Sequence, residues 1–455
     1  MVKSLIPVQS PGDSADPKCM GRIVELAPEA FVERLLARGQ RRAWIRTDPQ
    51  SGRVRASTPV LEELADYVEG QTDPERRHEA VFLGVGLETR ALFGVFVHRT
   101  QRGQAQGGVR HWPYPTMASF LRDGLRLSRG MSRKCALADL WWGGGKALIS
   151  RLPGDGWRDT DVRRKIYAEL GDFVSSLCGV YVTAEDVGTT PLDMVEVHRH
   201  TRFATCLPTE IGGSGNPSLM TARGVVCAME GALDFLERGS LRGAKVVMEG
   251  AGNVGACMID ELLERGVREI VATEICEERT AALQDRYADR PVRVMRVEPG
   301  DHRILAEPCD VLAPNALGGV LGPKTVPDVQ ARVVCGAANN ALSDETRDAR
   351  LLAERGILFV PDFLANRMGI VACSNEQYGS VPGDPDLARH LGRDWPGSVY
   401  NRTREVLARA RAEGTTPVAA ANAMADRKSD ELHPIFGDRA RRIIEGLVSE
   451  GWERG

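Results

Sequence analysis

The chain has 455 residues, of which 42% are hydrophobic and 27% charged, and this length predicts two domains rather than one core. The 59 lysines and arginines nearly balance 62 aspartates and glutamates, giving a formal net charge of -3, which argues against nucleic acid or an anionic membrane as the main partner. No apolar run approaches the ~20 residues that a membrane-spanning helix needs.

The N-terminal residues 1–21 contain Pro, Ser, Asp and Gly without a sustained apolar core. This composition predicts a mobile tail and excludes a secretion signal. The ten cysteines form no C-x-x-C pair, so neither a zinc site nor a small disulfide scaffold is indicated. We therefore expect reduced cysteines and a cytoplasmic location. We also expect no resident metal, since His198 and His200 lie two apart on a predicted extended or loop segment without a cluster of further ligands.

Up to about residue 216 the chain mixes helices and strands. We predict a helix over 28–37, a hairpin from the apolar runs 80–87 and 91–97, a helix over 162–177 and a strand over 180–183. The strand ends in Ala184-Glu185-Asp186-Val187-Gly188-Thr189, and strand ends commonly display catalytic groups.

Lys134 and Lys146 lie twelve residues apart, and the triplet Gly143-Gly144-Gly145 directly precedes the second lysine. Three consecutive glycines cost conformational entropy, which a fold tolerates only where the backbone must closely approach another group. We expect the triplet to form a loop. A lysine held beside it and near a second cation can lose its proton near neutral pH and act as a base. The alternative is a surface lysine after a flexible loop.

From about residue 217 short apolar runs alternate with helical stretches, which is typical of a parallel sheet covered on both faces. The strand candidates are 245–248, 269–273, 292–297, 310–313, 332–334 and 357–360. After about residue 375 only helices are predicted. The expected division is therefore a tail (1–21), a first domain (22–216), a second domain (217–374) and a C-terminal helical segment (375–455) that packs on the first domain.

The turn Gly250-Ala251-Gly252-Asn253-Val254-Gly255 joins a predicted strand to a predicted helix with G-x-G-x-x-G spacing, and Glu274 ends the next strand. The glycines, with Asn253 and Val254, would let backbone N–H groups approach a pyrophosphate, while Glu274 would accept from a ribose 2'-OH. Because a carboxylate repels a 2'-phosphate, NAD is favoured over NADP. An incidental glycine-rich turn is the alternative.

Nine ordered sequence blocks resemble the glutamate/leucine/phenylalanine/valine dehydrogenase family, and the residues before about position 75 look like an extension. The blocks are Gln106 to Arg110, Gly130-Met131 with Lys134, Gly143 to Lys146, Ala184 to Thr189, Ser214 to Ser218, Gly250 to Gly255, Ala313 to Gly319, Gly336 to Asn340, and Pro361 to Phe363 with Asn366.

The resemblance implies an α/β fold with an N-terminal substrate and oligomerisation domain, a Rossmann doubly wound NAD-binding domain, and C-terminal helices that return to the first domain. It also implies a homo-oligomer that catalyses reversible oxidative deamination of an L-amino acid to its 2-oxo acid and ammonia. Matching the motifs, Lys134 would bind the substrate carboxylate and lower the pKa of Lys146. Lys146 would be the general base, and Asp186 would transfer protons to and from the substrate nitrogen; a turn cap is the alternative for Asp186.

The same matching assigns the remaining contacts. Asn339 or Asn340 would order the nicotinamide and the substrate, and Ala316 belongs to the cofactor site. The substrate side chain would meet Met131, Ala184, Ile370 and Cys373, with Gly107 or Gly108 at the wall.

Two of the departures from the family pattern bear on the substrate pocket. Glutamate-specific members place a lysine immediately before the paired glycines, whereas this chain has Gln106. A buried substrate carboxylate would then lack a cation, so we expect a neutral side chain on the substrate. Met368 replaces a glycine, and we expect its side chain to intrude on the pocket or to tilt the backbone.

Other functions stay open at this point. Gln106, Met368 and the N-terminal extension favour a dehydrogenase of the same fold for an unusual, pathway-specific amino acid. A non-catalytic NAD-binding sensor is a second possibility, although a sensor has no need of a lysine with a lowered pKa. A two-domain reductase for a hydroxy acid ranks last, because no active-site histidine supports it.

Overall fold

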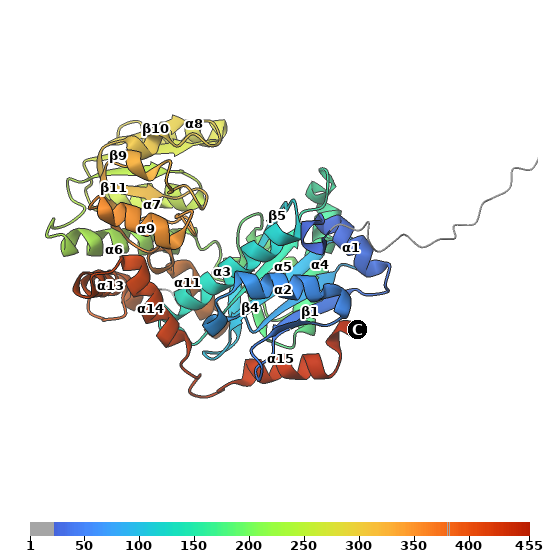
Figure 1. Cartoon of the computed structure of the whole chain (residues 1–455). Coiled ribbons are helices and arrows are strands. Elements are labelled where there is room, and N and C mark those ends of the chain that lie inside the picture. Colours follow the sequence, from blue (N-terminus) through green and yellow to red (C-terminus); the bar gives the residue numbers. More distant parts are fainter. Residues whose placement is uncertain (1–21, 380, 382) are drawn as a thin grey trace, which may run out of the picture.

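The structure is a computed structural model that describes residues 22–379, 381 and 383–455; the tail predicted over 1–21 lies outside them. Two β-sheets, each with its own helices, lie side by side, and helix α11 (Met368–Asn375) lies between them (Figure 1). The predicted α/β class with two sheet-containing units is confirmed.

The first sheet has seven strands in the order β2-β1-β3-β4-β6-β5-β7. It is mixed, because β5 runs parallel to β6 and β7 while the other pairs are antiparallel. The predicted hairpin is confirmed as β3 and β4, which pair from Ala80↔Val97 to Val85↔Leu92. The strands are β1 (Arg42–Thr47), β2 (Val54–Ala56), β3 (Ala80–Val85), β4 (Leu92–Arg99), β5 (Ala105–Trp112), β6 (Gly143–Ser150) and β7 (Tyr181–Glu185).

Helices cover both faces of this sheet because its strands alternate their apolar side chains between two cores. Val81 and Leu83 of β3 pack with α1, α2 and α3, whereas Ala80 and Phe82 pack with α4 and the end of the chain. The longest helix, α3, begins with a capping box between Thr116 and Ser119. These helices are α1 (Pro28–Leu36), α2 (Glu62–Gln71), α3 (Met117–Leu137), α4 (Thr160–Ser176) and α5 (Pro191–His200).

The second sheet has six strands, all parallel, in the order β10-β9-β8-β11-β12-β13. Counted along the chain, this is the order 3-2-1-4-5-6 of a doubly wound dinucleotide-binding sheet. All six predicted strands are present, with ends within about two residues of the prediction. They are β8 (Lys245–Glu249), β9 (Glu269–Glu274), β10 (Val292–Arg296), β11 (Cys309–Pro314), β12 (Ala331–Val334) and β13 (Leu358–Phe359).

Val246 and Met248 of β8 face a core shared with α6, α7 and α13, while Val247 faces a core shared with α9 and α14. The helices of this part are α6 (Ser218–Phe235), α7 (Asn253–Glu264), α8 (Glu277–Arg286), α9 (Glu345–Glu354), α10 (Asp362–Ala365), α12 (Pro385–Leu391), α13 (Val399–Glu413) and α14 (Pro417–Ser429). Helices therefore cover both faces of the sheet, as its buried apolar strands β8, β9 and β11 require.

The C-terminal helices divide between the two units. Helix α13 packs along α6, α14 contacts both α3 and α9, and α15 (Arg439–Ser449) runs under the first sheet. Trp452 then packs edge-on against Phe82 at 5.1 Å between ring centroids, so the end of the chain does return to the first sheet. Short 3-10 helices are η2 (Ile23–Glu25), η3 (Pro59–Leu61), η4 (Pro74–Arg76), η5 (Gly156–Arg158), η6 (Thr209–Ile211), η7 (Arg303–Ala306), η8 (Val326–Asp328), η9 (Glu376–Tyr378) and η10 (Trp452–Arg454).

His198 and His200 lie on α5, so the extended or loop segment predicted for them is wrong.

Among the residues that the structure describes, no helix has the length and the apolar character needed to cross a membrane.

Candidate active site

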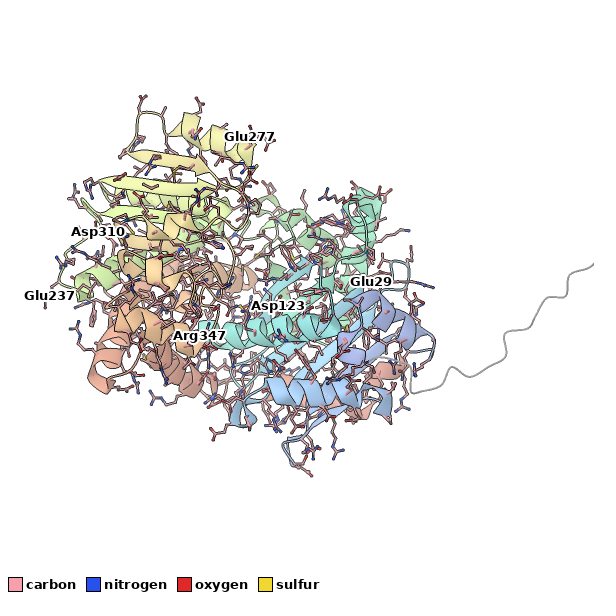
Figure 2. All side chains as sticks on the ribbon, turned by 45° about the horizontal axis from the view of Figure 1, so that its top comes forward. Glu29, Asp123, Glu237, Glu277, Asp310 and Arg347 are labelled. Atoms are coloured by element: carbon pink, nitrogen blue, oxygen red, sulfur yellow. The ribbon has the colours of Figure 1, made fainter. Side chains whose placement is uncertain are left out.

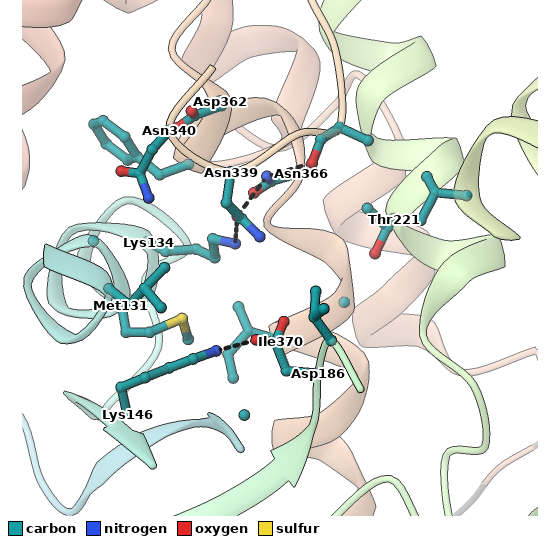
Figure 3. Close-up of a pocket in the computed structure, with 18 of the residues that line it drawn as sticks. Met131, Lys134, Lys146, Asp186, Thr221, Asn339, Asn340, Asp362, Asn366 and Ile370 are labelled. Carbon is teal, nitrogen blue, oxygen red and sulfur yellow. Dashed lines mark hydrogen bonds and ion pairs between the residues drawn. The ribbon is translucent and has the colours of Figure 1, made fainter. Parts of the chain in front are cut away.

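A cavity of about 840 Å³ opens between the two sheets. Side chains from α3, β6 and β7 approach it from the first sheet, and side chains from α6, α10 and α11 approach it from the second (Figure 3). Most of the predicted site residues line it, namely Gly108, Met131, Lys134, Lys146, Ala184, Asp186, Gly252, Asn253, Val254, Asn339, Asn340, Ile370 and Cys373.

The glycine triplet forms part of a buried strand, β6, so the predicted loop is wrong. Close packing explains the glycines, since a Cβ on Gly144 would lie 2.1 Å from the Ser132 backbone nitrogen of α3. A Cβ on Gly143 would lie 2.1 Å from the Arg99 carbonyl oxygen. The triplet thus lets α3 and β4 approach β6 closely, and it fixes Lys146 on a rigid element.

Lys146 is 4% exposed, and its Nζ donates to Asp186 Oδ2 at 2.7 Å. Burial lowers the pKa of Lys146, and the Asp186 carboxylate partly opposes this shift. Arg110 lies on the other side of Asp186, with Nε 3.4 Å from Oδ2. The pKa of Asp186 is about 2: burial raises it, but the charges of Lys146 and Arg110 outweigh that effect. The carboxyl is therefore ionised at neutral pH.

After burial, the charge of Arg110 lowers the pKa of Lys146, and this cation was not expected from the sequence. The charges of Lys134 and Lys146 also repel each other, and this repulsion lowers the pKa of Lys134. Arg110 is held by Asp123, at 3.1 Å from Nη1 to Oδ2. Asp123 projects from α3 (Figure 2). Tyr114 also donates to Asp123 Oδ2 at 2.8 Å.

Lys134 lies across the cavity from Lys146 and reaches the second unit. Its Nζ donates to Asn339 Oδ1 at 3.2 Å, and Asn366 Nδ2 donates to the same oxygen at 2.9 Å. Burial in the cleft lowers the pKa of Lys134 to about 8, although nearby Asp362 opposes the shift. This lysine therefore offers a cation at the point where the two sheets face each other.

Asp186 owes its position to the tight turn that follows β7. Its N–H donates to Thr189 Oγ1 at 2.9 Å, and that hydroxyl donates back to the Asp186 carbonyl oxygen at 2.7 Å. Gly188 has φ +85°, and a Cβ there would lie 2.3 Å from the His111 carbonyl oxygen. Only glycine fits this turn, which explains its place in the motif.

The predicted wall of the side-chain pocket is present in part. Gly108 lines the cavity together with Ala184, Met131, Ile370 and Cys373, whereas Gly107 does not. Gly107 packs instead against the neighbouring strand β6, where an added Cβ would lie 1.9 Å from the Gly145 carbonyl oxygen.

Gln106 lies one layer below this wall. It pairs with Gly144 and Val182 on the two neighbouring strands, and these residues stand two positions before Lys146 and Ala184. Gln106 is fully buried, and neither atom of its side-chain amide has a hydrogen-bond partner among the described residues. It brings no charge to the floor of the pocket.

Met368 does not line the pocket, so the first of its two expected outcomes, intrusion on the pocket, is wrong. It is fully buried in the core that α6 shares with α11, and a Cβ on Gly224 of α6 would lie 2.6 Å from Met368 Cγ. The absence of a side chain at Gly224 accommodates the methionine. Neighbouring Arg367 is also fully buried, and its guanidinium donates to the Leu137 and Gly397 carbonyl oxygens.

The turn after β8 has the geometry of a dinucleotide cradle. Gly250 has φ +102°, and a Cβ there would lie 2.9 Å from the Ala316 side chain. A Cβ on Gly255 would lie 2.5 Å from the Gly250 carbonyl oxygen, so this glycine allows α7 to start close to the strand. Gly252, Asn253 and the N-terminus of α7 face the cavity and can receive a pyrophosphate. Gly250, Gly255, Glu274 and Ala316 do not line it.

Glu274 ends β9 as predicted and is 6% exposed. Its Oε1 accepts from the N–H groups of Ile275 and Cys276 at 2.8 and 2.9 Å. Arg279, which the sequence analysis did not consider, lies 3.8 Å from Glu274 Oε2 and 3.3 Å from the position of a Cβ on Gly252. The acid expected to favour NAD thus has a cation beside it.

Sequence reasoning missed Arg110 as the charge partner of Asp186, and it missed Thr221 and Arg279 on the cavity wall. Arg110 is in the first motif block, two residues after Gly108, so strand periodicity could have placed it on the same face as the pocket. No group of three or more His, Cys, Asp or Glu side chains within residues 22–379, 381 and 383–455 is arranged to hold a metal ion.

Comparison with known families matches most of the chain. Residues 91–203 match the model described as Glu/Leu/Phe/Val dehydrogenase, dimerisation domain. Residues 212–433 match the model described as Glutamate/Leucine/Phenylalanine/Valine dehydrogenase.

Individual relatives agree with these matches. A valine dehydrogenase of Streptomyces albus is 36% identical over 80% of this chain and 94% of its own length. A phenylalanine dehydrogenase of Lysinibacillus sphaericus is 34% identical over 76% of this chain and 88% of its own length. A leucine dehydrogenase of Geobacillus stearothermophilus is 34% identical over 74% of this chain and 87% of its own length.

Two solved structures share the fold. L-tryptophan dehydrogenase from Nostoc punctiforme superposes with a TM-score of 0.62 at 28% identity, covering 80% of this chain and 99% of that one. The hetero-hexameric glutamate dehydrogenase from Thermus thermophilus superposes with a TM-score of 0.64 at 22% identity, covering 85% of this chain and 97% of that one.

Proposed function

The chain belongs to the Glu/Leu/Phe/Val dehydrogenase family and is an amino acid dehydrogenase, an oxidoreductase acting on CH–NH2 groups; from this premise we propose that it deaminates a neutral L-amino acid with NAD. The reaction yields the 2-oxo acid and ammonia and is reversible. One observation carries the proposal. Buried Lys146 contacts the ionised carboxylate of Asp186, and Lys134 lies across the cavity between the two sheets from this pair (Figure 3).

Lys146 is the proposed general base. Burial and the nearby Arg110 lower its pKa, so the ammonium group gives up its proton more readily than a lysine in water does. The neutral amine then takes a proton from the water that attacks the imino carbon of the oxidised substrate. A general base held in position contributes about 10²- to 10⁴-fold in rate.

Asp186 is the proposed proton carrier for the substrate nitrogen. With a pKa of about 2 it is ionised at neutral pH, so it accepts a proton from the substrate ammonium in the deamination direction. Its contact with Lys146 at 2.7 Å provides a direct route for proton exchange between the two groups.

Lys134 is the proposed partner of the substrate carboxylate, because it places a cation in the cavity and lies 3.2 Å from Asn339 of the second unit. Asn339 and Asn340 would in turn order the substrate and the nicotinamide. These contacts would hold the α-carbon of the substrate between the two units.

The family uses NAD(P), and the turn from Gly250 to Gly255 with the N-terminus of α7 would hold the pyrophosphate. When bound, the nicotinamide supplies the two-electron oxidation of the substrate α-carbon. We propose NAD as the preferred form, since the Glu274 carboxylate repels a 2'-phosphate. Arg279 weakens this preference because its charge partly neutralises Glu274.

A neutral substrate side chain is proposed because Gln106 brings no cation to the floor of the pocket, while Ala184, Ile370 and Cys373 make its wall largely apolar. The dimerisation-domain match supports an oligomer, which we take to be a homo-oligomer. A cytoplasmic location remains a prediction.

A panel of aliphatic, aromatic and acidic L-amino acids, each with NAD and with NADP, tests the proposal through the absorbance of the reduced cofactor. We expect turnover of neutral amino acids with NAD and little turnover of glutamate. If the protein binds NAD but oxidises no amino acid, the proposed activity is wrong and the sensor hypothesis gains support.

A further inference from the structure

Two buried thiols touch each other beside the cavity. The Sγ atoms of Cys206 and Cys373 lie 2.7 Å apart, although the residues are 167 positions apart in the sequence. Both are free cysteines and are 0% and 3% exposed. Among the nine cysteines that the structure describes, this is the only pair with sulfur atoms in contact.

Cys206 lies on a chain segment that joins the sheets, and Cys373 lies on a helix between them. Cys206 belongs to the segment from α5 to α6, where Thr205 N donates to the Thr183 carbonyl oxygen of β7 at 2.9 Å. Cys373 belongs to α11, which follows the last strand of the second sheet and lies between the two units (Figure 1). A covalent bond between the thiols would therefore tie α11 to the segment that leads from the first sheet to the second.

Glu376 already holds the two segments together without such a bond. Its carboxylate accepts from Cys206 N at 2.7 Å and from Ser214 N at 2.9 Å. The sulfur atoms are thus kept close in the reduced protein, and bond formation needs a movement of under about 1 Å to reach the ~2.05 Å of a disulfide.

We propose that Cys206 and Cys373 form a reversible disulfide when a hydroperoxide enters the cleft, and that this bond stops turnover. Cys373 lines the cavity and is the sulfur that a small oxidant reaches first, whereas Cys206 is enclosed. Cys373 is therefore the attacking thiol and Cys206 the resolving one.

The chemistry balances with hydrogen peroxide as the oxidant. The Cys373 sulfur attacks one peroxide oxygen, the O–O bond breaks, and one water leaves as the sulfenic acid forms. The Cys206 sulfur then attacks the Cys373 sulfur, the S–O bond breaks, and a second water leaves. Two thiols lose two electrons and two protons, and one peroxide is reduced to two waters.

The bond would act on the reaction through α11. Ile370 and Cys373 of this helix line the pocket, so the disulfide moves part of its wall and ties it to the segment beside β7. Dehydrogenation requires the cleft to close for reaction and to open for product release. A covalent link between α11 and the segment that joins the sheets opposes that movement.

The pH dependence of the oxidation follows from the environment of the thiol. The hydrogen bond with Cys206 and burial raise the pKa of Cys373, and Glu376 adds to the shift. Because the thiolate is the reactive form, oxidation should accelerate as the pH rises toward that pKa.

The test uses the full-length protein in a Cys178→Ser background, which removes an exposed thiol that could link two molecules. This protein and the same protein with Cys206→Ser are treated with hydrogen peroxide, then digested without reduction for mass spectrometry. Turnover of the best substrate is measured before oxidation, after it, and after dithiothreitol. The turnover measurement rests on the proposed function, but the peptide map does not.

We expect a Cys206–Cys373 cross-linked peptide and a loss of turnover of at least about tenfold that dithiothreitol reverses. With Cys206→Ser, the basal turnover stays unchanged, the cross-link is absent, and dithiothreitol-reversible inactivation is lost. Absence of the cross-link from the oxidised parent overturns the proposal, and a complete cross-link with unchanged turnover also overturns it. If Cys206→Ser does not fold, as judged by circular dichroism, Cys206→Ala replaces it.

Discussion

The two sheets differ in how directly their sequences encode them. The second sheet is parallel and buried on both faces, so each strand is a short apolar run between helices. The first sheet is mixed, and its strands β5 and β6 contain two and three glycines. The sheet with the regular pattern would hold the cofactor, whereas the irregular one carries Lys146 and Asp186.

This difference has a physical reason. A catalytic side chain needs exact placement, and here the placement comes from close backbone packing that only glycine permits. A dinucleotide needs one turn and one helix N-terminus on an otherwise ordinary sheet. The comparison predicts that changes in the first sheet act on turnover or folding, while changes at the second act on cofactor affinity.

The largest effect is expected for Lys146→Ala, because it removes the proposed general base. Turnover should fall by about 10³-fold, within the range for general bases, while NAD affinity changes little. Steady-state kinetics and NAD binding by fluorescence measure the two quantities. Lys324→Ala, at an exposed lysine, is the matched control and should leave both unchanged. Turnover retained by Lys146→Ala would exclude this lysine as the base.

Asp186→Asn should lower turnover by about 10²-fold and also change its pH dependence. Activity appears as the pH rises through the pKa of Lys146, since the neutral amine is the active form. Asp186 raises that pKa, so its neutralisation shifts the acidic limb of the kcat profile to lower pH. A limb that moves to higher pH, or stays in place, would contradict the assigned coupling.

Gly144→Ala tests whether the triplet serves packing. The new Cβ would lie 2.1 Å from the Ser132 backbone nitrogen, so we expect a loss of about 1–3 kcal/mol in the free energy of unfolding. Gly446→Ala on α15 is the control, because nothing lies within 4 Å of its Cβ, and it should be neutral or stabilising. Equal melting temperatures for the two variants would mean that β6 is not closely packed.

The smallest effect is expected for Arg279→Ala, which leaves Glu274 without its cation. The ratio of NADP to NAD affinity should fall by about fivefold, in keeping with the small free energy of a partly exposed ion pair. Turnover at saturating NAD should not change. If Arg279→Ala binds NADP more tightly than the parent protein does, Arg279 does not help to bind a 2'-phosphate.

Several features could be predicted from the sequence because they depend on local pattern. The six parallel strands, the hairpin of β3 and β4, and the turn from Gly250 to Gly255 each combine a recognisable period with a glycine that its backbone requires. The motif blocks likewise identified the family, which the matches over residues 91–203 and 212–433 bear out.

Other features depend on which segments meet in space. Strands β5 and β6 were missed since glycine disfavours strands unless neighbouring backbone approaches closely. From the sequence, Met368 was expected to intrude on the pocket or to tilt the backbone, but Gly224 on another helix makes room for its side chain in the core. Arg110 was missed as a cation that lowers the pKa of Lys146 for the same reason: a pKa depends on three-dimensional distance and burial, not on spacing along the chain.

The sequence by itself therefore determined the fold class, the family and the residue types that carry the chemistry, because short-range patterns record them. The tertiary structure decided which cation faces Asp186, where Met368 goes and that Cys206 meets Cys373. These outcomes depend on packing between segments far apart in the chain, and single-residue patterns do not encode such contacts.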